Sequence, residues 1–207
     1  SSYGDTDDAT IAQALLDQFP GVGDVEPGEP PFDIVNMSFG GVCDDDDPPV
    51  AIAQAIATIQ AAYTAPTPGP DADQPRVVFV ASAGNAATCQ PTWPASFENV
   101  IGVAALGPDG PAPFTNWGPW VDACAPGVDV ISTFYDLGPQ ARFDADQYDG
   151  WAKWSGTSFA APIVAASIAW EWMSRGNAGN PGDAAEWLLN RPGLTRLPNL
   201  GTVVNFY

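Results

Sequence analysis

Three short segments place side chains that could together perform acyl-transfer chemistry. The first is Trp154–Ala166 (WSGTSFAAPIVAA), in which Gly156 permits a tight turn and Ser158 follows in the first turn of a predicted helix. Small and apolar residues continue all round this helix, which predicts that it is buried. A serine hydroxyl at a buried helix N-terminus lies in a positive backbone field that suits a developing oxyanion. Taken alone, the segment is equally consistent with Ser158 acting only as an N-cap.

The second segment is Val80–Asn85 (VASAGN), which follows a run typical of a buried strand. Its small residues Ser82, Ala83 and Gly84 let another backbone approach closely, and Asn85 ends the run with an amide donor. A side-chain amide aimed at a tetrahedral intermediate contributes about 3 kcal/mol to lowering the barrier. The alternative role for Asn85 is to form a turn before a loop.

The third segment is Ile34–Gly41 (IVNMSFGG), where a predicted strand continues into an extended edge. A substrate backbone can lie along Ser38, Phe39 and Gly40 and add a strand there, because glycine allows close approach. The alternative is a simple loop between a strand and a helix.

These segments lie in a pattern of alternating strands and helices. The sequence predicts strands over 32–37, 76–81, 99–105, 120–123 and 128–132, and helices over 9–19, 50–63, 156–175 and 183–190. Thr6, Asp7 or Asp8 can cap the first helix. The alternation predicts an α/β fold, a mostly parallel sheet with helices on both faces. We expect one domain over residues 1–207, with 136–149 as a surface insertion.

The composition excludes two classes of partner. The chain has 25 acidic and 6 basic residues and a net charge of −19, so it repels nucleic-acid phosphates and anionic lipid. We expect the acidic residues to keep the protein soluble or to adapt it to high salt concentration. The alternative is that they attract basic substrates. The sequence contains no run of about 18 apolar residues, so we predict no membrane span. No signal segment is visible at residue 1.

The cysteines leave two interpretations open. Cys43 and Cys89 lie in Gly/Asp/Pro-rich loops, and a disulfide between them would indicate an oxidising, extracytoplasmic or secreted location. The alternative is three free thiols, with Cys124 in an apolar run as a buried small hydrophobe. Without a CxxC pair or a histidine, we expect no metal site. The run Asp44–Asp47 lacks the spacing of a calcium loop, so we expect it to be solvated.

The three segments, in this order, resemble the substrate strand, the oxyanion-hole strand and the nucleophile helix of the subtilase family of serine proteases (peptidase S8). The resemblance covers about Asp33–Trp172. It implies a subtilisin-like fold of which this chain is the C-terminal portion. Calcium is common in the family, and we assign no residues to it.

The resemblance implies a role for each matched residue. Ser158 is the expected nucleophile, and Asn85 is the expected oxyanion donor together with the backbone N–H of Ser158. Ser38–Gly40 and Ser82–Gly84 would form the two walls of the main specificity pocket. Trp93–Pro94 would be a cis peptide, as in relatives.

Two positions depart from the family pattern. Ile163 stands where relatives often have histidine, and Ala86 follows Asn85, so that position adds no charge to the pocket.

No residue supplies the general base that such a serine needs. The chain has no histidine, and in subtilases the triad runs Asp, His, Ser along the chain. We therefore expect Asp and His to come from an N-terminal segment outside this chain. We expect this chain by itself to be inactive. The alternative is a lysine or carboxylate base, and Lys153 and Arg142 are the basic side chains nearest the expected nucleophile in sequence.

The expected activity is therefore that of a serine endopeptidase acting on peptide or protein substrates. The alternative is a non-catalytic peptide-binding or scaffold module, a pseudoprotease. A different α/β hydrolase is disfavoured, because that fold wants G-x-S-x-G followed by Asp and His. Without the N-terminal strands a sheet edge and a helix face would be bare, so we expect the isolated chain to pair, self-associate or aggregate.

Overall fold

The structure is a computed structural model in which residues 7–23, 29–43, 48–63, 76–136, 149–176 and 179–205 are described. The helices are α1 (Asp8–Asp17), α2 (Val50–Ala62), α3 (Thr157–Ser174) and α4 (Pro181–Asn190). The strands are β1 (Ile34–Met37), β2 (Val78–Ser82), β3 (Val100–Gly107), β4 (Gly110–Pro111), β5 (Ala123–Pro126), β6 (Val130–Asp136), β7 (Asp149–Trp154), β8 (Arg196–Leu197) and β9 (Gly201–Val203).

The main sheet has the strand order β1-β2-β3-β5-β9-β8. The pairs from β1 through β9 are parallel, whereas β8 pairs antiparallel with β9 and β4 pairs antiparallel with β3. The carboxyl ends of the parallel strands therefore meet at one edge, which is where the predicted site residues follow β1 and β2.

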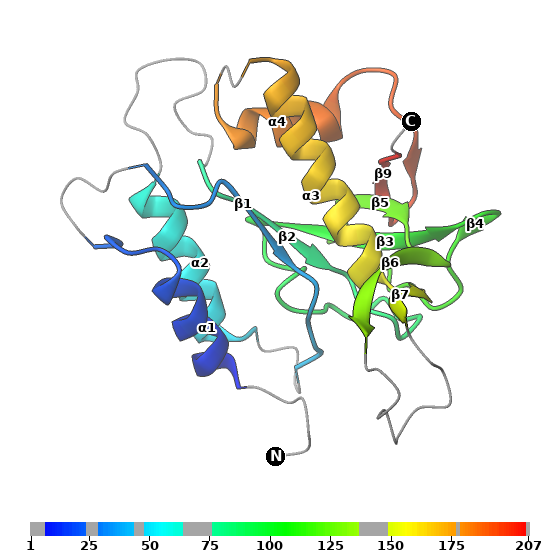
Figure 1. Ribbon diagram of the computed structural model, residues 1–207, viewed down its shortest axis with the longest axis horizontal. Coiled ribbons are helices and arrows are strands. Elements are labelled where there is room, and N and C mark those ends of the chain that lie inside the picture. The colour runs from blue at the N-terminus through cyan, green and yellow to red at the C-terminus, as the bar shows by residue number, and fades with distance from the viewer. Residues whose placement is uncertain are drawn as a thin grey trace.

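Helices cover both faces of this sheet, as predicted (Figure 1). Strand β2 is buried along its whole length and alternates between two cores. Val78 and Val80 pack in the core shared with α3 and α4, whereas Phe79 and Ala81 pack in the core shared with α2. A strand buried on both faces explains the unbroken apolar run seen in the sequence.

The carboxylate of Asp8 joins the first two helices, α1 and α2. The preceding residue, Asp7, caps α1 itself, its side chain accepting from Thr10 N–H at 2.8 Å. Asp8 then accepts from the N–H groups of Ala51 and Ile52, both at 2.9 Å. Helix α2 has no side-chain cap from its own N-cap residue, so the carboxylate of Asp8 supplies one from the neighbouring helix.

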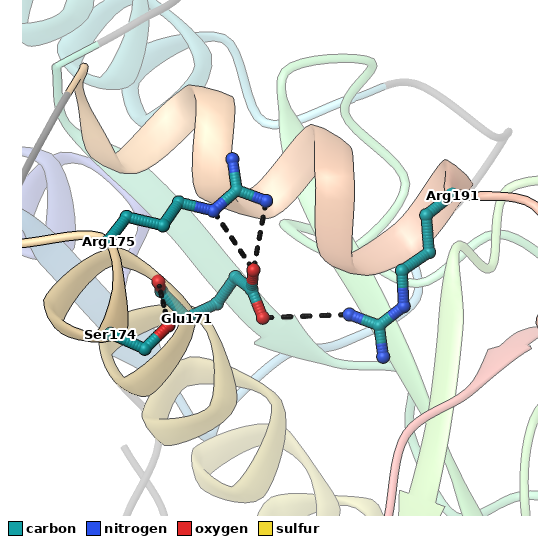
Figure 2. A network of polar contacts seen from close by, with 4 residues as sticks. All are labelled: Glu171, Ser174, Arg175 and Arg191. Atoms are coloured by element: carbon teal, nitrogen blue, oxygen red, sulfur yellow. Dashed lines mark hydrogen bonds and ion pairs between the residues drawn. The ribbon is translucent and has the colours of Figure 1, made fainter.

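A polar network joins the C-terminal ends of α3 and α4 (Figure 2). Oε1 of Glu171 binds Arg175 through Nε at 3.0 Å and a terminal nitrogen at 2.9 Å. Its other oxygen lies 3.5 Å from Arg191, at the end of α4. The guanidinium of Arg175 lies 4.9 Å from the ring centroid of Trp187, so the network also packs α4 against α3.

The structure corrects the predicted sheet. The predicted strand at 128–132 belongs to a separate antiparallel ribbon formed by β6 and β7, outside the main sheet. The sequence did not reveal β4, β7, β8 or β9, because these strands are short or lack alternating apolar residues. Residues 137–148 of the predicted insertion lie outside the described part of the chain.

The predicted disulfide is wrong, because Cys43 and Cys89 are not bonded to each other. Cys124 is fully buried in β5, as expected, and burial raises the pKa of its thiol to about 12. Among the described helices, none has the length and apolar character needed to cross a bilayer.

Candidate active site

Ser158 lies at the start of α3, one residue after the first helical position. The N-cap is Gly156, which makes no side-chain capping bond, so the N-cap alternative for Ser158 is wrong. The Ser158 side chain is half-buried, and its hydroxyl donates to the backbone carbonyl of Ser38 at 3.3 Å. Its hydroxyl therefore points across the site rather than back to its own helix.

Ser38 and Ser158 bind each other in both directions. The hydroxyl of Ser38 donates to the carbonyl of Ser158 at 2.8 Å and accepts from Nδ2 of Asn36 at 2.9 Å. These bonds fix the chain that leaves β1 against the N-terminus of α3. The structure thus brings together two segments that lie 120 residues apart in the sequence.

Asn85 lies beside the same helix end. Its Oδ1 accepts from the backbone N–H of Thr157 at 2.8 Å and from the Thr157 hydroxyl at 3.1 Å. That hydroxyl also accepts from the N–H of Gly84 at 3.0 Å. The side chain of Asn85 is thus held by α3, and its residue is solvent-exposed. Nδ2 of Asn85 has no partner among the residues described, so its two N–H bonds are free to donate to a ligand.

The predicted substrate residues have different environments. Phe39 and Gly40 are exposed, whereas Ser82 and Ala83 are buried and Gly84 is half-buried. Of the second run, only Gly84 therefore borders the open side of the site.

A cavity of about 790 Å³ adjoins the Phe39–Gly41 edge. Its wall is mainly apolar. It is formed by α1, by the start of α2, by the segment that follows β1 and by Trp93 and Pro94, which lie between β2 and β3. The lining residues are Asp8, Ile11, Ala14, Leu15, Phe39, Gly40, Gly41, Val42, Cys43, Pro49, Ile52, Trp93 and Pro94.

The peptide bond between Trp93 and Pro94 is cis, as predicted. Trp93 pairs with Gly41 in an antiparallel bridge with N–O distances of 2.9 and 3.0 Å. A Cβ on Gly40 would lie 2.7 Å from the carbonyl oxygen of Trp93. Gly40 therefore admits the backbone of Trp93, because a side chain at this position would clash with it.

No described residue supplies a base to Ser158. Nζ of Lys153, on β7, lies 3.4 Å from a carboxylate oxygen of Asp129, just before β6, and no bond joins it to Ser158. Arg142 lies outside the described residues. Ile163 packs partly buried against the main core.

Thr157 is a site residue that the sequence analysis missed. It is completely buried, and its hydroxyl bridges Gly84 and Asn85. Its place directly before Ser158 was a usable signal, because a residue at the first position of a helix contacts the segment that lies beside the helix end.

Metal ligands are not gathered in the described part of the chain. No group there of three or more histidine, cysteine, aspartate or glutamate side chains could hold an ion. Asp44–Asp47 lies outside the described residues, and the calcium of other family members has no assigned site here.

The sequence profile of the subtilase family (peptidase S8) matches residues 3–193. The chain belongs to the subtilase family. A thermophilic serine proteinase of Bacillus sp. (strain AK1) is 45% identical over 89 residues, which cover 42% of this chain and 19% of the relative. An extracellular protease of Xanthomonas campestris pv. campestris is 30% identical over 140 residues, covering 67% of this chain and 21% of the relative.

Solved subtilases share the fold. A cold-adapted subtilisin-like serine proteinase matches with a TM-score of 0.68 at 23% identity, over 99% of this chain and 63% of that one. The matches with this subtilase chain thus cover less than two thirds of the length of each of these relatives.

Proposed function

We propose that this subtilase chain is the part of a serine endopeptidase that holds the nucleophile, the oxyanion donors and the substrate edge. The observation that carries the proposal is the meeting of Ser158, Asn85 and Ser38 at the N-terminus of α3. Peptide-bond hydrolysis by a serine protease has three separate requirements, which these residues supply: a hydroxyl, an amide donor with free N–H bonds and an extended backbone edge.

In this proposal the hydroxyl oxygen of Ser158 attacks the scissile carbonyl carbon. Nδ2 of Asn85 and the backbone N–H of Ser158 donate to the oxyanion that forms. The bond to the leaving amine breaks, the amine takes the proton that left Ser158, and water later hydrolyses the acyl-enzyme. Ser158 donates to the Ser38 carbonyl in the present geometry, a backbone group that orients the hydroxyl and cannot take its proton.

The proton acceptor in this proposal is a histidine, oriented by an aspartate, from a segment outside residues 1–207. Its docking surface is a bare edge beside Ser158. Within the described chain, β1 pairs with β2 alone, so its other edge is open. The outer face of α3 is apolar and exposed, with Trp170 at 67% and Met173 at 63%. A strand added to β1 would end near Ser38, which bonds to Ser158, whereas Trp170 and Met173 lie toward the opposite, C-terminal end of α3.

Peptide substrates are the proposed ligands. An extended chain would lie along Ser38–Gly40, with Gly84 on the opposite wall, and the apolar cavity beside Phe39 would take a bulky apolar side chain. We infer an extracytoplasmic location from the extracellular relative rather than from a disulfide.

One observation favours the alternative of a non-catalytic, peptide-binding module. The chain has no histidine, and the hydroxyl of Ser158 touches no base among the residues described. That alternative predicts peptide binding without turnover even when every segment of the protein is present.

A phosphonate probe separates the two functions. In the full-length protein, a peptidyl phosphonate should label Ser158, because only an activated serine displaces the leaving group from phosphorus at a useful rate. Ser158→Ala should abolish labelling, whereas Ser155→Ala, a nearby hydroxyl that accepts from Asp129 N–H, should leave it intact. Binding of a peptide without labelling or cleavage in the full-length protein would establish the module instead.

A further inference from the structure

Asn116 is a buried amide in the loop between β4 and β5. It is 2% exposed, and the sequence analysis assigned it no role. A buried asparagine has two N–H donors and a carbonyl acceptor to satisfy, so its partners show which part of the fold it organises.

All of its side-chain bonds go to one loop. Oδ1 accepts from the N–H groups of Ala86 at 2.8 Å and Thr88 at 3.3 Å. Nδ2 donates to the carbonyl of Ala83 at 2.9 Å and to the hydroxyl of Thr92 at 3.0 Å. The partners lie on both sides of Asn85, and none is Asn85 itself.

Backbone hydrogen bonds also join this loop to residues 114–116. The N–H of Asn116 donates to the carbonyl of Gly84 at 2.9 Å, and the N–H of Ala87 donates to the carbonyl of Phe114 at 2.8 Å. Every residue from 83 to 88 except Asn85 therefore bonds to residues 114–116, and the one omitted residue is the proposed oxyanion donor.

The loop needs such support, because its backbone is not one that its own sequence favours. Ala87 has a φ of 51°, in the left-handed region that non-glycine residues rarely adopt. Gly84 has a φ of 99°, and a Cβ there would lie 2.5 Å from Nδ2 of Asn116. The backbone of the loop thus packs against the side chain of Asn116 at Gly84, so closely that only glycine fits at this position.

We propose that Asn116 is a positioning residue that holds the backbone of Asn85 so that its Nδ2 reaches the oxyanion; this rests on the proposed function. Thr157 fixes the amide end of Asn85, and Asn116 fixes the chain that carries it. A donor displaced by about 1 Å can lower the rate about 10²-fold. Loss of Asn116 should therefore lower kcat although the residue never contacts substrate.

The test is a double-mutant cycle in the full-length protease. Asn85→Ala should lower kcat about 10²- to 10³-fold with little change in KM. Asn116→Ala should lower kcat about 10- to 100-fold, again with KM within about threefold of wild type. If Asn116 acts through Asn85, the double variant should be no slower than Asn85→Ala alone. Independent, multiplicative losses of kcat would overturn the proposal.

Thr202→Val provides a matched control for lost stability. Its hydroxyl is completely buried in β9 and donates to the carbonyl of Leu189 at 2.7 Å. Strand β9 is separated by β3 and β5 from β2, the strand that leads to Asn85. This variant should lose thermal stability while its kcat stays within about twofold of wild type. An equal loss of kcat in Thr202→Val would mean that destabilisation alone explains the Asn116 result.

A milder variant covers the case in which Asn116→Ala does not fold. Thr92→Val removes only the hydroxyl that accepts from Nδ2 of Asn116, and it should lower kcat about 3- to 10-fold with the same dependence on Asn85. Unchanged kcat in Thr92→Val would contradict the proposal.

Hydrogen exchange decides the positioning step without using activity. The amides of residues 83–88 should exchange at least about tenfold faster in the Asn116 or Thr92 variant than in wild type, and no faster in Thr202→Val. Unchanged exchange overturns the positioning role. If exchange rises but Asn85→Ala leaves kcat unaltered, the oxyanion role in the proposed function fails while Asn116 still holds the loop.

Discussion

Thr157 donates its backbone N–H and its hydroxyl to the same atom, Oδ1 of Asn85, at 2.8 and 3.1 Å. Two donors on the carbonyl oxygen decide which way the amide faces, because a flipped amide would set N–H against N–H. The Nδ2 group of Asn85 is thereby turned away from Thr157. Thr157, the residue before the proposed nucleophile, thus determines the direction in which the proposed oxyanion donor points.

Removal of the Thr157 hydroxyl tests this relationship. Thr157→Val deletes one donor to Asn85 and the acceptor for Gly84 N–H, so we expect a fall in kcat of about tenfold. Thr157→Ser keeps the hydroxyl and should retain most of the wild-type kcat. Steady-state kinetics of the full-length protein on a peptide substrate measure both, and an equal loss in the Ser variant would point to packing of the methyl group instead.

Asp122 should make stability fall as pH rises. Burial raises the pKa of its carboxyl to about 6, against the opposing effects of the Gly102 N–H and of Arg196. The unfolded chain has the ordinary value of 3.8, so the folded state binds more protons between about pH 4 and 6. The contribution of this group is full below pH 3.8 and is lost as pH rises through about 6.

Asp122→Asn should therefore stabilise the protein at neutral pH. The amide oxygen can still accept from Gly102 N–H, and no charge is buried, so we expect a gain in the free energy of unfolding on the order of 2–3 kcal/mol at pH 8. The gain should vanish near pH 3.5. Denaturant melts of the variant and wild type at both pH values measure the difference, with the exposed Asp109→Asn as control. A gain that does not depend on pH would refute the assignment.

Glu171 should stabilise the junction of α3 and α4 (Figure 2). Its side chain is 19% exposed and binds two arginines, so Glu171→Gln should lower the free energy of unfolding by about 1 kcal/mol. Glu186→Gln, at an exposed position of α4, is the matched control and should change it by less than about 0.5 kcal/mol. Equal effects of both substitutions in thermal melts would show that the network contributes nothing specific.

Salt should raise the melting temperature. A net charge of −19 destabilises the folded state through self-repulsion. Screening shortens the reach of this repulsion from about 10 Å at 0.1 M to about 3 Å at 1 M salt. We expect Tm to rise with KCl and level off near 1 M. A flat or falling Tm would contradict the prediction, and a rise that continues to several molar would indicate salt exclusion rather than screening.

Much of the site followed from local sequence. The glycine before Thr157 and Ser158, the buried helix after them and the apolar run ending at Asn85 are short-range patterns, and each forms its predicted element. The α/β fold with helices on both faces followed from the alternation of such elements. The roles of Ser158, Asn85 and the substrate edge came from the family resemblance and stay proposals.

Contacts between distant segments were decided by tertiary structure alone. No local pattern shows that Asp8 caps α2, that Cys43 and Cys89 are not bonded, or that the β6–β7 ribbon leaves the main sheet. The side-chain hydrogen-bond partners of Thr157 and Asn116 are 24 to 73 residues away along the chain. Side-chain type and spacing determined which residues can do chemistry here, but a hydrogen bond between distant residues depends on positions that only the packed sheet and α3 create.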